Sequence, residues 1–186
     1  MTARMFMPSP SRFNPKVLVL WKTLSLLTVL LGVWAFVIEP DQVTVQHIPI
    51  EVSQWHGEHH DLRIAVLSDL HIGAPHLDVE KLHAVVARTN SETPDIIVLL
   101  GDFVISGVLG GSSVEPERIA QELKNLRAPL GVIAVLGNHD WWYDGERVRN
   151  ALQKARIRVL ENEAIRVYRG PILLGCWFGR LMDQDS

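Results

Sequence analysis

The sequence contains very little cysteine, and this limits the chemistry open to it. Cys176 is the single thiol among 186 residues, so an internal disulfide framework and a cysteine-based zinc cluster are both excluded. Eight histidines are present, so a metal site would rely on imidazole and oxygen ligands. Hydrophobic residues make up 47% of the chain and charged residues 21%, which is typical of a globular protein and excludes a disordered, collagenous or coiled-coil chain.

A net positive charge is found only at the amino end, and the rest of the chain is acidic. Residues 1–40 hold four basic residues and one acidic residue, whereas the rest of the chain holds 14 basic and 20 acidic residues. A nucleic-acid partner needs a basic face that neutralises phosphates, so the acidic remainder argues against such a partner. The basic amino end needs a separate explanation.

A long apolar run supplies that explanation. Residues 17–38 read VLVLWKTLSLLTVLLGVWAFVI, with Lys22 as the one charge. A helix of this length extends roughly 33 Å, enough to cross a hydrocarbon core of about 30 Å. The alternatives are a buried core helix and a cleaved signal peptide, but the run exceeds the usual apolar part of a signal peptide, and Ala35-Phe36-Val37 is a poor cleavage site. We therefore expect an uncleaved transmembrane anchor.

The charges that flank this run predict its orientation. Arg4, Arg12 and Lys16 precede it, whereas Glu39 and Asp41 follow it. Because basic residues are retained on the cytoplasmic side of a membrane, the amino terminus is expected inside the cell. We expect a single-pass protein of the inner or plasma membrane whose domain lies on the extracytoplasmic, periplasmic side.

The pattern of the chain predicts its organisation. We expect a disordered tail over residues 1–16, the anchor over 17–38, a linker with an edge strand at 43–52 over 39–61, and an α/β domain over 62–186. Apolar strands that alternate with amphipathic helices are typical of a mainly parallel sheet covered on both faces. The strands are expected at 62–67, 96–100, 132–136, 157–160, 164–168 and 172–176, and the helices at 78–90, 117–126 and 144–155.

Polar clusters directly follow the first three strands. Asp69 and His71 follow the first, Asp102 the second, and Asn138 and His139 the third, with spacings of 33 and 36 residues that fit one strand–helix unit each. The carboxyl ends of parallel strands meet at one edge of a sheet, where ligands bind. In an extended stretch Asp69 and His71 would face the same side and chelate one cation, and the two oxygens of Asp102 could bridge two cations about 3.5–4 Å apart. Each cluster alone is a commonplace turn, but their conjunction predicts a metal site.

Three stretches resemble the opening signatures of the calcineurin-like metallophosphoesterases: Ser-Asp-Leu-His at 68–71, Leu-Gly-Asp at 100–102 and Leu-Gly-Asn-His-Asp at 136–140. The resemblance covers about residues 62–175. It implies a layered αββα sandwich that hydrolyses phosphate mono- or diesters with two divalent ions, for which manganese, iron and zinc are all suitable. The anchor and short core are also similar to a bacterial branch of membrane-associated phosphodiesterases, some of which act on lipid-linked and hence amphiphilic substrates.

The resemblance assigns roles by matching position. Asp69 and His71 would bind the first metal and Asp102 would bridge both. Asn138 would bind the second metal, and His139 would assist the leaving group. Two ions of this kind yield hydroxide near neutral pH and clamp the phosphoryl oxygens, while the histidine donates a proton to the departing alkoxide.

Four other residues each keep two interpretations from sequence. Asp140 either tunes His139 or caps a turn or helix, and both interpretations stay open. His76, Trp141 and Trp142 are candidate substrate contacts, although packing of at least one tryptophan on the core is the alternative.

The family normally has two later signatures, a Gly-His and a Gly-His-x-His, whereas His139 is the last histidine of this sequence. We therefore expect an incomplete domain, a carboxy-terminally truncated product that holds metal weakly and hydrolyses esters poorly. The alternative from another class is a non-catalytic membrane-anchored remnant with a binding or regulatory role. A nuclease of the same family is disfavoured by the acidic charge, and the oligomeric state stays open.

Overall fold

The computed structural model describes residues 14–52, 61–105, 110–169 and 172–178. The chain forms two compact units, Met1–Gln42 and Val43–Ser186. The tail expected over residues 1–16 lies almost entirely outside the described residues.

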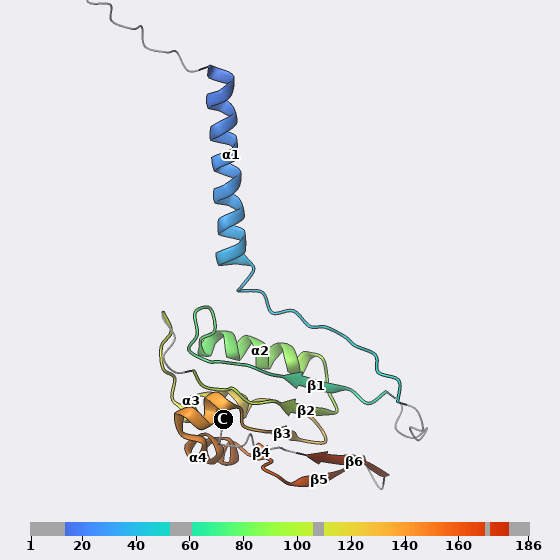
Figure 1. Cartoon of the computed structure of the whole chain (residues 1–186). Coiled ribbons are helices and arrows are strands. Elements are labelled where there is room, and N and C mark those ends of the chain that lie inside the picture. Colours follow the sequence, from blue (N-terminus) through green and yellow to red (C-terminus); the bar gives the residue numbers. More distant parts are fainter. Residues whose placement is uncertain (1–13, 53–60, 106–109, 170–171, 179–186) are drawn as a thin grey trace, which may run out of the picture. The chain divides into compact units, whose positions relative to one another are not determined.

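The first unit contains the apolar helix. Helix α1 (Pro15–Val33) continues into the π-helical segment η1 (Trp34–Ile38) (Figure 1). It begins where it does because the Asn14 side chain accepts a hydrogen bond from the Lys16 N–H (3.0 Å) and Pro15 stands at the first helical position. The helix thus starts two residues before the expected segment. By length and composition its 24 residues, 15–38, can cross a membrane.

The edge strand expected at 43–52 is wrong. Residues 43–52 pair with no strand in the described part of the chain. Pro49 has no N–H to donate to a ladder, and Ile48 and Ile50 are left exposed rather than packed. Alternating apolar residues produce a strand only where a surface exists to bury them.

The second unit is built on a parallel sheet of four strands, in the order β1-β2-β3-β4 (Figure 1). Strands β5 and β6 form a separate antiparallel pair. All six strands fall within or next to the apolar runs that predicted them. Their bounds are β1 (Ile64–Leu67), β2 (Ile96–Leu99), β3 (Val132–Ala134), β4 (Arg158–Val159), β5 (Ala164–Arg169) and β6 (Ile172–Phe178).

Helices α2 (Val79–Ser91), α3 (Pro116–Leu123) and α4 (Asn138–Lys154) connect these strands. Helix α4 begins six residues before the predicted start at 144, and Asp144 interrupts it with non-helical angles (φ −177°, ψ 87°). The Asp144 carboxylate accepts the Arg147 N–H (3.0 Å), as a helix cap does. The sequence pattern therefore identified only the second half of a kinked helix.

The helices cover one face of the sheet, and residues of β5 pack against the other. Ile97 and Leu99 of β2 pack among buried residues of all three helices, whereas Ile96 belongs to a second cluster with Ile165 and Val167 of β5. Each strand–helix–strand step moves in the same direction along the sheet, so right-handed crossovers bring every helix to the same face. This arrangement leaves the carboxyl ends of β1, β2 and β3 side by side.

Candidate metal centre

The loops that follow β1 and β2 have a left-handed backbone. The φ angles are 53° at Asp69, 39° at His71 and 54° at Asp102. The expectation that Asp69 and His71 lie on an extended stretch is therefore wrong. The His71 N–H donates to the Asp102 carbonyl (2.8 Å) and the Ile72 N–H to the Phe103 carbonyl (2.9 Å), so hydrogen bonds between the loops hold this conformation. A left-handed conformation costs a residue with a side chain roughly 1–2 kcal/mol, and such strain is concentrated at functional sites.

Two glycines allow the loops after β2 and β3 to touch. A Cβ atom on Gly101 would lie 2.3 Å from the Gly137 nitrogen, and a Cβ atom on Gly137 would lie 2.1 Å from Oδ1 of Asp102. Gly101 also has a φ of +91°, which favours glycine. The glycine before Asp102 and the glycine before Asn138 are thus required by close backbone approach.

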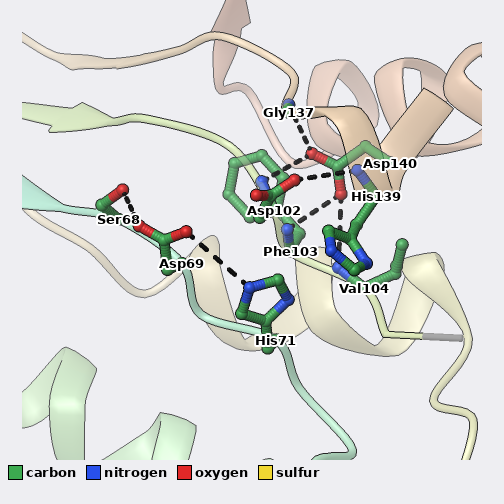
Figure 2. A network of polar contacts seen from close by, with 9 residues as sticks. All are labelled: Ser68, Asp69, His71, Asp102, Phe103, Val104, Gly137, His139 and Asp140. Carbon is green, nitrogen blue, oxygen red and sulfur yellow. Dashed lines mark hydrogen bonds and ion pairs between the residues drawn. The ribbon is translucent and has the colours of Figure 1, made fainter. Parts of the chain in front are cut away.

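Asp140 joins the same two loops from inside the protein. Its fully buried carboxylate accepts backbone N–H groups of Asp102 (2.9 Å), Phe103 (2.8 Å), Val104 (3.2 Å) and Gly137 (2.9 Å), as Figure 2 shows. Burial raises the pKa of this carboxyl, and the four N–H donors oppose the shift. These contacts correspond to the capping interpretation of Asp140, because both oxygens are engaged by the backbone.

Three side chains converge at this edge of the sheet. His71, Asp102 and His139 each offer a ligand atom, and these atoms lie within 4.8 Å of one another. The two imidazole rings meet edge to face with centroids 4.7 Å apart (Figure 2). Nδ1 of each ring is buried and has no hydrogen-bond partner among the described residues. A carboxylate with two imidazoles suits a divalent transition metal, and an ion would satisfy the buried nitrogens. The residues present therefore fit a metal ion.

The other predicted ligands lie beside this triad. Oδ1 of Asp69 is 3.7 Å from Nε2 of His71, and its second oxygen accepts the Ser68 hydroxyl. Asn138 is the half-buried first residue of α4. The His139 N–H donates to Oδ1 of Asp102 (2.9 Å), which orients that carboxylate. The residues alone leave His139 as either a ligand nitrogen or a proton donor, and the family resemblance implies the second role.

The structure separates the three candidate substrate contacts. Trp141 is half-buried against the core, with the Arg149 guanidinium 5.6 Å from its ring centroid. Trp142 is exposed and its ring centroid lies 4.9 Å from that of His139. His76 is exposed in the loop after Ile72, and the described residues show no contact between it and the triad. Of the three, Trp142 is placed at the site.

Known proteins are similar to this chain in sequence. Residues 62–175 match the family model of the calcineurin-like phosphoesterases. The UDP-2,3-diacylglucosamine pyrophosphatase LpxG of Chlamydia trachomatis is 40% identical over 114 residues, which are 61% of this chain and 33% of that protein. An uncharacterized metallophosphoesterase of Aquifex aeolicus is 33% identical over 115 residues, 62% of this chain and 42% of the relative.

A zebrafish (Danio rerio) transmembrane protein with a metallophosphoesterase domain is 30% identical over 145 residues, 77% of this chain and 32% of the relative. The matched region thus spans between 32% and 42% of the length of these curated relatives. No solved structure matches the chain significantly. The family model covers more than half of the sequence and includes all three polar clusters. The chain therefore belongs to the calcineurin-like phosphoesterase family of metal-dependent hydrolases.

Proposed function

We propose that this chain hydrolyses phosphate esters at the edge of the sheet where β1, β2 and β3 end. Asp69, His71, Asp102 and Asn138 would hold two divalent ions, and His139 would act on the leaving group. The observation that carries the proposal is the convergence of His71, Asp102 and His139, in which Nδ1 of both imidazoles is buried and has no hydrogen-bond partner among the described residues. Buried polar atoms are almost always satisfied, so the unpaired nitrogen of His71 favours a bound cation, and that of His139 favours a substrate group within hydrogen-bond reach.

The chain's own residues prepare the site. Bound divalent ions would supply an activated water nucleophile and offset charge on the phosphoryl oxygens. Asp69, 3.7 Å from Nε2 of His71, would fix the orientation of that ring. The His139 N–H engages Oδ1 of Asp102 and leaves Oδ2 of that carboxylate for an ion.

His139 would move a proton. Its ring contacts that of His71 edge to face, so a proton on the His139 imidazole would lie beside an ester held by the neighbouring ligands. Donation of this proton to the departing oxygen would avoid a free alkoxide. Because Asp140 is engaged by backbone N–H groups, His139 would act here without a carboxylate from its own helix turn.

The substrate and location are inferred from the relatives and the apolar helix. The printed name of LpxG describes a pyrophosphatase of a diacylated sugar nucleotide, which supports an amphiphilic phosphate ester as the substrate. Helix α1 with η1 and the relatives named as transmembrane proteins support a single-pass anchor. The charges flanking this helix favour an extracytoplasmic domain.

Metal titration of the full chain in detergent tests the proposal. Calorimetry with Mn²⁺ and hydrolysis of bis(p-nitrophenyl) phosphate would be compared for the wild type, Asp102→Asn and the control Asp78→Asn. Asp78 caps α2 through the Lys81 N–H, so its substitution leaves the site intact. We expect Mn²⁺ binding and Mn²⁺-dependent hydrolysis in the wild type and the control, and loss of both in Asp102→Asn. Equal Mn²⁺ binding by all three proteins would contradict the proposed site, and ordinary turnover would contradict only the expected impairment.

A further inference from the structure

Trp142 is a large aromatic side chain that does not pack into the hydrophobic core. Among the described aromatic side chains of the second unit it is the most exposed, at 70%, followed by Tyr168 at 49%. The adjacent Trp141 packs into the structure: a Cβ atom on Gly145 would lie 2.2 Å from its ring, so glycine makes room for that indole. Two consecutive tryptophans thus have different roles, and only Trp141 contributes to the core.

The position of Trp142 relative to the site is fixed by buried contacts. Trp142 lies on the first part of α4, before the kink at Asp144. The Asp140 carboxylate ties this part of the helix to the backbone of Asp102. The Trp142 ring meets that of His139 at 58° with centroids 4.9 Å apart. The indole therefore extends the site at the ring we assign as the proton donor.

We propose, on the basis of the function proposed above, that Trp142 binds the leaving group of the substrate. The group on the oxygen that His139 protonates would carry an aromatic or apolar face that packs on the indole. Tryptophan suits this role because it presents a large rigid surface at little cost in conformational entropy. The substrate class is then a phosphate ester or anhydride whose departing portion has such a face.

The surroundings of Trp142 favour a substrate group over a protein or bilayer surface. Its neighbours along the helix include the half-buried Asn138 and His139 and the exposed Asp144 and Glu146, all of which are polar. Protein and membrane docking sites are contiguous apolar patches, whereas a single aromatic ring among polar groups matches one face of a small ligand.

Two phosphonates test the proposal without turnover, because their phosphorus–carbon bond is not an ester. Phenylphosphonate and methylphosphonate share the oxygens that a metal site would bind, and they differ in the aromatic ring. Calorimetry with the full chain and Mn²⁺ should show that the wild type binds phenylphosphonate about fivefold more tightly, as expected for one aromatic contact. Trp142→Ala should bind both equally, Trp142→Phe should keep part of the preference, and Tyr168→Ala should behave as the wild type.

The outcomes separate this inference from the proposed function. A preference for phenylphosphonate that survives in Trp142→Ala would overturn the role of Trp142, as would a wild type that binds both phosphonates equally. If neither phosphonate bound the wild type, the phosphate-ester site itself would be refuted, and the role of Trp142 with it. If Trp142→Ala lost methylphosphonate binding as well, Trp142 would be supporting the site rather than the leaving group, which also overturns the inference.

Discussion

Replacing Asp140 with asparagine tests the hydrogen bonds that join the loops after β2 and β3. The carboxylate oxygens accept four backbone N–H groups, from Asp102, Phe103, Val104 and Gly137. Asn keeps the shape of the side chain but exchanges one oxygen for an NH₂ group. A carbonyl oxygen accepts about two hydrogen bonds, so two of the four donors would face another donor.

The expected loss follows from those two donors. A buried polar group without a partner costs roughly 1–3 kcal/mol, which gives about 2–6 kcal/mol for two such groups. The neutral side chain avoids the cost of burying a charge, the same cost that raises the pKa of Asp140, and this offsets part of the loss. We expect a net destabilisation of about 3 kcal/mol, equivalent to a fall in melting temperature of roughly 10 °C for a domain of this size.

Thermal unfolding of the full chain in detergent, followed by near-ultraviolet circular dichroism, would measure this loss. Asp144→Asn is the matched control, because Asp144 lies on the same helix and accepts one backbone N–H, from Arg147, which asparagine can also cap. The control should lie within about 0.5 kcal/mol of the wild type. If Asp140→Asn matched the control, the assignment of Asp140 as the buried link between the loops would be refuted.

Three further predictions concern packing, metal and charge. Gly137→Ala would place a methyl group 2.1 Å from Oδ1 of Asp102 and should lower the free energy of unfolding by about 2–3 kcal/mol. The control Gly131→Ala, with φ +95° and no atom within 4 Å of the added Cβ, should lower it by about 1 kcal/mol. Equal losses in thermal unfolding would contradict the close approach at Gly137. Mn²⁺ at a hundred times its dissociation constant should stabilise the wild type by about 2.7 kcal/mol and leave Asp102→Asn unchanged, and an unshifted wild type would count against the metal site. Arg147 lowers the pKa of Glu117, chiefly through a side-chain hydrogen bond. The ionised glutamate therefore stabilises the folded state at pH values above the pKa of Glu117 in the unfolded chain, and this stabilisation is lost as the pH falls through the lower pKa of the folded state. The stability advantage of the wild type over Glu117→Gln should therefore shrink between about pH 7 and pH 3, and an advantage independent of pH would show that the pair contributes nothing.

Several elements were predictable because their signals are local. The apolar runs at Ile96–Leu99 and Val132–Ala134 predict buried strands whatever surrounds them, and Asp78 ahead of an amphipathic stretch predicts the start of α2. The polar residues after each strand were then expected at one edge of a parallel sheet. The family match over residues 62–175 agrees with that interpretation. The metal roles of Asp69, His71, Asp102 and Asn138 and the catalytic role of His139 stay predictions.

Other features depend on residues far apart in the chain. The start of α4 was missed because Asp144 interrupts the helical pattern, and the edge strand at 43–52 was wrong because no apolar surface covers Ile48 and Ile50. The left-handed backbone at Asp69 and His71 arises from hydrogen bonds between loops. None of these three outcomes can be predicted from a short window of sequence.

Residue order alone determined the strand–helix alternation, the apolar amino-terminal helix and the three polar clusters that identify the family. These properties rest on side-chain periodicity and backbone preferences, which act over a few residues. Only the tertiary structure decided that Asp140 serves the backbone, that His139 joins His71 and Asp102, and that Trp142 rather than Trp141 lies open at the site. Those outcomes depend on which groups are buried together once the sheet has formed, and burial determines which polar atoms need partners.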